Sequence, residues 1–189
     1  MAFDFARARD NMVESQVRTQ DVTDAALLDA MRSAPRESLV PTREAWRAYA
    51  EAEIAYAPER WLMRPRDIGK LLQALEPRAG ERALAIAAPY AALLLEGMGL
   101  IVRRLDEGDL KQIEGVYDVV VCEGAVCRAP DSWKAALAEG GRLGVVEREG
   151  PVARARLYLR AHDAVGARTL FDSSAPLLAG FEPPRTFTF

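Results

Sequence analysis

From Glu81 onward, short apolar runs of strand length alternate with segments of helical character, and this rhythm restricts the fold more than any other feature. The expected strands cover residues 82–87, 100–105, 117–122 and 143–147. Such continuous apolar runs are typical of parallel strands that are buried on both faces. Helices are expected from Pro89 to Gly97 and over 130–139, the latter capped at Gly140. We therefore predict an α/β fold around a mostly parallel, Rossmann-like sheet.

The chain that follows these runs has a different pattern. Over residues 153–160, arginine and tyrosine alternate with alanine and leucine, which is typical of a half-exposed antiparallel strand. Residues 163–166 are expected to turn, and residues 168–171 to return as the second strand of a C-terminal hairpin. Residues 186–189 are expected to form a last edge strand. The arginines of 153–160 are expected on a solvated face rather than in an anion or nucleic-acid site, because the chain as a whole is acidic.

The first third of the chain is predicted to be helical. A helix over 5–16 is followed by a second one, for which Asp21 and Thr23 are candidate N-caps. A third helix is expected to open at Pro41 and to turn Trp46 inward. This region is therefore predicted to form a helical layer that packs on the sheet.

A fourth helix has the clearest periodicity in the sequence. It begins at Pro65, after a short extended piece around 54–56, and its apolar residues recur at helical spacing, at Ile68, Leu71, Leu72 and Leu75. Proline and glycine end it before residue 81. We divide the chain into a helical region of residues 1–80 and a truncated sheet domain of residues 81–189, which together form one compact unit.

Composition excludes several classes of function. The formal net charge of −3 argues against a basic surface for nucleic acid or anionic lipid. Cys122 and Cys127 are too few for a disulfide framework or a four-ligand zinc site, so no metal is expected. Both are interpreted as structural, although Cys127 beside Arg128 leaves a reactive thiol open. The single histidine, His162, is expected in a solvated turn beside Asp163, with a catalytic dyad as the open alternative.

Residues 83–102 form an apolar stretch long enough to resemble a membrane span. Pro89 and Glu96 interrupt it and alanine supplies much of it, so a strand followed by a helix explains it better. The first ten residues carry charges throughout and lack the apolar core of a signal peptide. We therefore expect a soluble, cytoplasmic protein without membrane contact.

The turn from the first strand into the following helix is where a parallel sheet of this kind binds a nucleotide-like ligand. Glycine is needed there, because the backbone must approach the ligand closely and present its N–H groups to it. Residues 84–90 read Leu-Ala-Ile-Ala-Ala-Pro-Tyr, without any glycine, and Pro89 removes one N–H. The residues alone therefore indicate a Rossmann-like sheet that lacks a cofactor cradle.

Short segments that follow one another in order over nearly the whole chain carry a family resemblance. They are residues 11–18, 21–24, 34–41, 60–65, 117–121, 124–126, 139–143, 170–176 and 180–181. Each is weak alone, but the ordered set resembles the protein-L-isoaspartate O-methyltransferase family, in a form common among bacterial members. The resemblance implies a methyltransferase sheet, S-adenosylmethionine as cofactor and methyl transfer to the carboxylate of an isoaspartyl residue.

This resemblance fails at the first cofactor motif. The family has an acidic residue in the strand, followed by Gly-x-Gly-x-Gly, and only the aromatic residue after that motif has a counterpart here. The corresponding positions of this chain are Ala85, Ala87, Ala88, Pro89 and Tyr90. A Cβ at former glycine positions blocks close approach of a ligand. No cofactor-binding residue is therefore expected in this turn.

Three acidic residues are candidates for a cofactor site that survives the loss of the glycine motif. The family's ribose-binding acid at the end of the second strand is matched by Asp106 or Glu107. Only ten residues then precede Tyr117, so one β-α unit of the family fold is shortened. Glu123 lies at the carboxyl end of the following strand, where pockets form in such sheets, and is a candidate pocket residue.

We therefore predict a degenerate member of this family, with no catalytic residue, no bound cofactor and a role as an interaction or regulatory module. The alternative is an active S-adenosylmethionine-dependent protein carboxyl methyltransferase with an atypical cofactor loop. Shortening the sheet uncovers residues 100–105 as an edge strand, which the N-terminal helices or a second copy of the chain are expected to cover. The expected partner is a protein or a homodimer mate, with no nucleic acid, membrane or metal.

Overall fold

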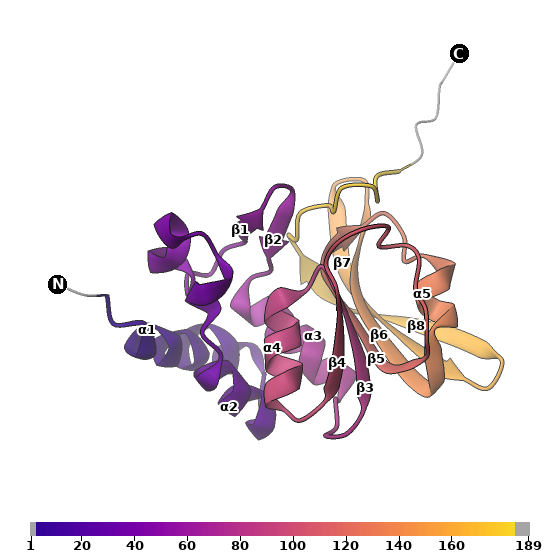
Figure 1. The fold of residues 1–189 in the computed structure, drawn as a ribbon, viewed down its shortest axis with the longest axis horizontal. Helices are drawn as coiled ribbons and strands as arrows, with labels where there is room; N and C mark the ends of the chain where they lie inside the picture. The colour runs from indigo at the N-terminus through magenta and orange to yellow at the C-terminus, as the bar shows by residue number, and fades with distance from the viewer. Residues whose placement is uncertain (1–2, 184–189) are drawn as a thin grey trace, which may run out of the picture.

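The computed structural model describes residues 3–183, and its centre is a six-stranded sheet (Figure 1). The strands lie in the order β4-β3-β5-β6-β7-β8, and their bounds are β3 Arg82–Ile86, β4 Ile101–Leu105, β5 Tyr117–Val126, β6 Leu137–Glu149, β7 Val152–Ala161 and β8 Ala164–Ser173. The first four in this order run parallel, whereas β7 and β8 are antiparallel. The predicted α/β fold, mostly parallel with an antiparallel C-terminal hairpin, is confirmed.

Helices cover both faces of the parallel strands, which explains why those strands are apolar throughout. The helices are α1 Phe5–Met12, α2 Ala25–Ser33, α3 Pro65–Leu75, α4 Pro89–Gly97 and α5 Asp131–Ala135. α3 and α4 pack on one face. On the other face lie α5 and the loop of residues 106–116, which connects β4 to β5.

The N-terminal region packs on α3 and α4, on the side away from the sheet (Figure 1). It also contains a π turn at Val13–Val17, 3-10 helices at Arg18–Gln20, Arg36–Leu39 and Thr42–Arg47, and a hairpin of β1 Ile54–Ala57 and β2 Arg60–Leu62. Met12 and Met31 belong to the same buried cluster as Leu71 of α3 and Leu94 of α4. The division of the chain at residue 80 stays a prediction.

Two expectations for the N-terminal helices are wrong. Asp24, rather than Asp21 or Thr23, caps α2 by accepting a hydrogen bond from the N–H of Leu27 at 2.7 Å. Asp21 instead has the left-handed φ of +63°. Trp46 is 64% exposed rather than turned inward. The segment after Pro41 is a 3-10 helix, whose tighter turn places successive side chains at different angles from those of an α-helix.

The boundary between α5 and β6 also differs from the expected one. α5 ends at Ala135, and residues 137–139, expected to be helical, begin β6 because Leu137 pairs with Tyr117. Gly140 therefore does not cap a helix: it lies within the strand, with a φ of +72°. Pairing with a strand that is distant in sequence therefore overrides the local helical preference of residues 137–139.

The C-terminal hairpin turns earlier than expected. The turn consists of His162 and Asp163 rather than residues 163–166, because Ala164 already pairs with β7. The expected strand over 186–189 lies outside the described residues.

The polar face of β7 is only partly solvated. Tyr158 is 9% exposed beside α5, and its hydroxyl donates a hydrogen bond to Glu147 at 2.6 Å. Arg154 forms an ion pair with Asp172 of β8 at 3.5 Å, in keeping with an outward-facing position. The expectation of a solvated face holds for Arg154 but is wrong for Tyr158, which α5 covers.

β4 lies at one edge of the sheet, as the shortened fold requires. Ile101 at its start is 67% exposed, and α2 packs against α4 rather than against β4. The expectation that the N-terminal helices cover this edge is therefore wrong, and pairing with a second copy stays a prediction. Arg104 pairs with Glu96 at 2.8 Å, so part of the strand carries charge, which disfavours indiscriminate strand pairing.

The apolar stretch of residues 83–102 divides into β3, α4 and the start of β4. Within residues 3–183, no helix is long and apolar enough to cross a membrane.

Candidate functional site

The turn between β3 and α4 lies at the carboxyl ends of the parallel strands, where sheets of this kind bind ligands. Ala87 has a left-handed φ of +46°, and its N–H donates to the carbonyl of Leu105 at 2.9 Å. A left-handed conformation costs an alanine about 1 kcal/mol, so the turn keeps a shape that suits glycine. Ala85, Ala87 and Ala88 are at most 1% exposed. Their methyl groups are therefore part of the core at the place where a ligand would approach.

The N–H groups around the start of α4 already have partners within the chain. The N–H of Tyr90 donates to Glu123 Oε2 at 3.2 Å, and the N–H of Ala91 also donates to that carboxylate. The N–H of Ala88 donates to Asp106. A helix N-terminus favours an anion, because its free N–H groups carry the positive end of the helix dipole. Here two carboxylates of the chain itself occupy that position.

Glu123 is completely buried on β5, and its second oxygen, Oε1, has no hydrogen-bond partner among the described residues. Burial raises the pKa of Glu123 to about 7, against the opposing effects of the Arg36 charge and the N–H groups of α4. A carboxyl group in this state exchanges its proton near neutral pH. The candidate site therefore contains a titrating group that is closed off from solvent.

Arg36 is the buried cation of this cluster. It is 0% exposed, its guanidinium lies 4.5 Å from the centre of the Tyr90 ring, and burial lowers its pKa. Its Nε and Nη2 donate to the carbonyls of Ala48 at 2.8 Å and Met63 at 2.6 Å. Nη1 of Arg36 and the hydroxyl of Tyr90 have no partner among the described residues. Arg36 thus joins the N-terminal region to α4 and stands near the carboxylate of Glu123.

The remaining acidic candidates separate. Asp106 caps the turn, and partial desolvation raises its pKa, against the attraction of Arg104. Glu107 is exposed and points to no described partner in the turn. Tyr56 of β1 donates its hydroxyl to the carbonyl of Ala87 at 3.2 Å. The structure therefore brings Asp106 and Glu123 together at the turn and leaves Glu107 outside.

The comparisons with known proteins give the family. No family model matches the chain. The protein-L-isoaspartate O-methyltransferase of Methylorubrum populi is 32% identical, over 94% of this chain and 97% of that protein. The same enzyme of Methylorubrum extorquens is 30% identical, over 94% of this chain and 91% of that protein. This chain belongs to the protein-L-isoaspartate O-methyltransferase family.

Solved structures of the protein-L-isoaspartate O-methyltransferase family share the fold. A Plasmodium falciparum protein described as such a methyltransferase, in complex with S-adenosyl-L-homocysteine, matches with a TM-score of 0.73 and 12% identity. That match covers 90% of this chain and 97% of the other. A second structure, titled protein-L-isoaspartate O-methyltransferase, matches with a TM-score of 0.71 and 17% identity, over 91% of this chain and 66% of the other. At these identities the matches support the fold alone.

Of the other sequence candidates, His162 lies far from the turn that bears the family's first motif, whereas Cys122 pairs with Ile86 directly before that turn. His162 is 94% exposed, with its Nδ1 3.8 Å from Glu139. Cys122 is buried on β5. Burial raises the pKa of its thiol, which favours the unreactive protonated form. Cys127 is half-buried and free. Within residues 3–183 no group of three or more His, Cys, Asp or Glu side chains is arranged to hold a metal.

Sequence reasoning missed Arg36, although the segment that contains it, residues 34–41, belongs to the family resemblance. Arginine is abundant in this chain, and nothing in the local pattern marks this one as buried. Its burial depends on carbonyls contributed by Ala48 and Met63, which only the folded chain brings together. A fully buried arginine is rare in proteins. Its burial beside Tyr90 therefore marks the site, but only once the structure is known.

Proposed function

We propose that this chain is a degenerate protein-L-isoaspartate O-methyltransferase that does not bind S-adenosylmethionine and acts as an interaction or regulatory module. One observation carries the proposal: the N–H groups of Ala88, Tyr90 and Ala91 are bonded to the chain's own Asp106 and Glu123. The residues of the turn therefore do not fit the cofactor, and no catalytic step is assigned to them.

The energetic argument follows from what the cofactor would have to displace. Glu123 would have to leave two N–H groups of α4, and each such hydrogen bond contributes about 0.5–1.5 kcal/mol when the carboxyl group is neutral and about 1.5–3 kcal/mol when it is ionised. The buried methyl groups of Ala87 and Ala88 would also have to move, in a region packed as closely as the rest of the core. Together these costs weaken cofactor binding by several orders of magnitude relative to an open, glycine-lined turn.

The alternative function is that of the active enzyme, and the sequence relationship favours it. Relatives that are 30–32% identical over nearly the whole chain are named protein-L-isoaspartate O-methyltransferase. A structural neighbour is bound to S-adenosyl-L-homocysteine. For this reading, the carboxylates at the turn would have to move on binding and expose the N–H groups that they now cap.

S-Adenosylhomocysteine binding separates the two functions. We expect no heat in calorimetry and no change in the melting temperature of the wild-type chain. A competent site filled at about a hundred times its dissociation constant would stabilise the fold by about 2.7 kcal/mol and raise the melting temperature by about 5–10 °C. Labelled methyl transfer to an isoaspartyl peptide is likewise expected to be absent.

A triple variant tests whether the turn itself blocks the cofactor. Ala87→Gly, Ala88→Gly and Glu123→Gly together remove the methyl groups and the carboxylate, and the variant is expected to gain measurable S-adenosylhomocysteine binding. Its control is Glu139→Gly, at an exposed position of β6, which is expected to stay without binding. Micromolar binding by the wild-type chain would disprove degeneracy and restore the enzyme as the first reading.

The interaction role has a candidate surface in the edge of β4. Ile101 is 67% exposed, and Val116 in the neighbouring loop is 51% exposed. Unpaired edge strands with exposed apolar residues pair readily with another chain. We expect light scattering at tens of micromolar, above typical dissociation constants of weak dimers, to show a species heavier than 20.8 kDa. Ile101→Lys is expected to return it to the monomer mass, and a monomeric wild-type chain would contradict the homodimer.

A further inference from the structure

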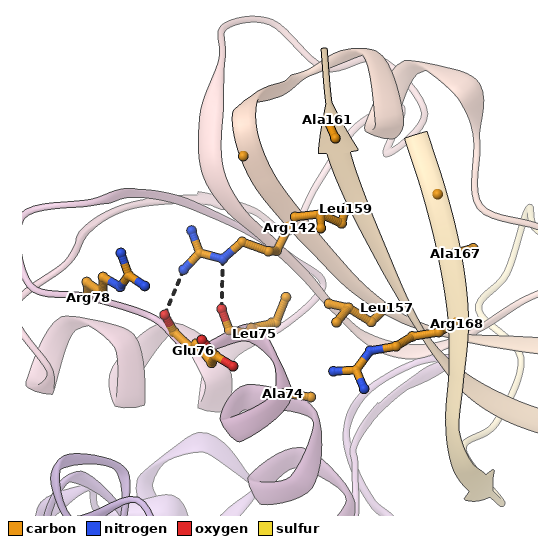
Figure 2. Close-up of a pocket in the computed structure, with 12 residues that line it drawn as sticks. Ala74, Leu75, Glu76, Arg78, Arg142, Leu157, Leu159, Ala161, Ala167 and Arg168 are labelled. Atoms are coloured by element: carbon orange, nitrogen blue, oxygen red, sulfur yellow. Dashed lines mark hydrogen bonds between the residues drawn. The ribbon is translucent and has the colours of Figure 1, made fainter. Parts of the chain in front are cut away.

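A hollow of about 580 Å³ lies at the opposite end of the sheet from the turn after β3. Its walls come from the end of α3, the start of β6 and the β7–β8 hairpin (Figure 2). Ligand sites of globular proteins have volumes of about 300–1,000 Å³ and are mainly apolar. This hollow has the size of such a site, and it shares no residue with the turn that bears the family's first motif.

The apolar wall exists because α3 is shorter than the strands that it covers. α3 ends at Leu75, where Glu76 has a left-handed φ of +47°. β7 continues beyond that point, and side chains two positions apart share one face of a strand. Leu157, still beneath the helix, is 8% exposed, whereas Leu159 on the same face is 46% exposed. The sheet therefore presents uncovered leucine and alanine side chains just past the end of the helix.

Gly166 of β8 deepens the hollow opposite Leu159, with which it pairs. A Cβ built at Gly166 would meet no atom within 4 Å, and its φ is not in the left-handed region. A side chain at this position therefore starts into open space from an unstrained backbone. This makes position 166 suitable for filling the hollow by substitution.

The charges around the hollow are mainly positive, although the chain as a whole has a net charge of −3. Arg142 is fully engaged: its Nε and Nη2 donate to the carbonyls of Leu75 at 2.9 Å and Glu76 at 2.7 Å, and it forms an ion pair with Glu81 (Figure 2). By contrast, Arg78 and Arg168 form no ion pair among the described residues, and Glu76 is the only carboxylate among the residues that line the hollow.

Arg78 and Arg168 stand on different walls. Figure 2 shows Arg168 extending from β8 toward the end of α3, and Arg78 lying beyond Glu76 on the chain that follows α3. In the view of Figure 2, Leu75 and Glu76 lie between the two arginines, and Leu157 and Leu159 lie on the side of Arg168. An arginine guanidinium binds a carboxylate with two parallel hydrogen bonds. An arginine without an ion-pair partner at the rim of the hollow therefore suits an anionic ligand.

We propose that this hollow binds a free amphipathic carboxylate, a small molecule with an acyl or aryl body and one anionic group. The body lies on Leu157, Leu159 and Ala161, and the carboxylate is held by Arg168 of β8. A neutral or cationic molecule of the same shape gains only the apolar contact. This site is independent of the proposed loss of cofactor binding, since the two lie at opposite ends of the sheet.

Decanoate tests the proposal, with decanol and decylamine as matched ligands of the same chain length. Calorimetry on the full chain is expected to show one decanoate bound per chain, with a dissociation constant below about 1 mM. Decanol is expected to bind about tenfold more weakly, because it cannot form the charge-assisted pair, and decylamine more weakly still. Vesicles of anionic phospholipid are expected not to bind, which separates a free carboxylate from a membrane surface.

Variants assign the binding to the hollow. Arg168→Glu is expected to weaken decanoate binding at least tenfold, and Gly166→Leu is expected to abolish it by filling the space. The matched control is Arg43→Glu, a charge reversal at a residue that is 84% exposed and distant in the fold, which is expected to bind as the wild type does. Circular dichroism and the melting temperature confirm that each variant is folded.

Three results would overturn the proposal. They are the absence of saturable decanoate binding by the wild-type chain, equal affinity for decanoate and decanol, and unchanged binding by both Arg168→Glu and Gly166→Leu. An effect of Arg43→Glu equal to that of Arg168→Glu would also overturn it, because it would show a response to net charge alone.

Discussion

Replacement of Trp133 by alanine is expected to lower the free energy of unfolding by about 3–5 kcal/mol, the usual cost of removing a buried aromatic side chain. Trp133 is 0% exposed on α5, and its ring lies 5.4 Å from that of Phe181. Its indole N–H donates to the carbonyl of Leu110 at 2.8 Å. The substitution therefore leaves a cavity and also an unpaired buried carbonyl in the loop of residues 106–116.

This effect matters because that loop covers part of the sheet face on which α5 packs. Leu110 is 4% exposed and packs in the cluster around Trp133, so the tryptophan anchors the replacement to the sheet. Without the anchor, the face of β3 and β5 that α5 and the loop cover would be open to water. Trp133 thus holds the loop of residues 106–116 on the sheet.

Urea unfolding followed by circular dichroism measures the loss. The melting temperature is expected to fall by about 10 °C, since a domain of this size shifts by about 2–4 °C per kcal/mol. The matched control is Trp46→Ala, which removes the same side chain from a position that is 64% exposed and is expected to cost less than about 0.5 kcal/mol. Equal losses for the two variants would show that the loop does not depend on Trp133.

Glu123→Gln is expected to stabilise the fold above pH 7 and to leave it nearly unchanged at about pH 5. Burial raises the pKa of Glu123 to about 7, from an ordinary value of 4.5. In the folded chain the carboxyl group keeps its proton over this interval, whereas in the unfolded chain it ionises. The stability contributed by this group is therefore fully present below about pH 4.5 and is lost as the pH rises to about 7.

The size of the effect follows from the shift, because one pKa unit corresponds to about 1.4 kcal/mol. The loss between pH 4.5 and 7 is thus on the order of 3 kcal/mol, and glutamine, which does not ionise, escapes it. The other charged or titratable groups near Glu123 are Arg36, Tyr90, Asp106, Cys122 and Tyr56, and they are the same in both proteins. The difference between variant and wild type therefore isolates Glu123.

Denaturant unfolding at about pH 5 and about pH 8 provides the measurement. Glu139→Gln, at a side chain that is 66% exposed, is the control and is expected to follow the wild type at both values. A constant difference between Glu123→Gln and the wild type across this range would show that Glu123 is ionised in the folded chain. In that case the charge of Arg36, rather than the burial of Glu123, decides its state.

The parallel strands and α3 were predictable because one physical feature specifies each of them. Strands buried on both faces must be apolar throughout, and α3 has an uninterrupted helical repeat that ends in a fully buried Leu75. The start of β6 was not predictable, because residues 135–139 favour a helix locally. Their strand conformation comes from the pairing of Leu137 with Tyr117, twenty residues away in sequence.

Of the candidate site, only the side chains near the ends of strands were predictable from the sequence. Asp106 and Glu123 lie near the ends of predicted strands, and the carboxyl ends of parallel strands meet at one edge of a sheet. That Glu123 points back onto α4 could not be foreseen, since nothing in residues 117–126 fixes its rotamer. The hollow beside Gly166 was likewise hidden, because it depends on where α3 ends relative to β7.

The buried cluster that contains Met12 also contains Ala175, so the two ends of the chain complete a single core. Ser173 donates to Asp67 of α3 at 2.8 Å, and the two residues are 106 positions apart. During synthesis, at about 5–20 residues per second, the first α-helices therefore wait about ten seconds or longer for the strands that bury them. A ribosome-bound chain of this protein exposes α3 and α4 throughout that interval. A product that lacks the last hairpin therefore has no finished core to fold around.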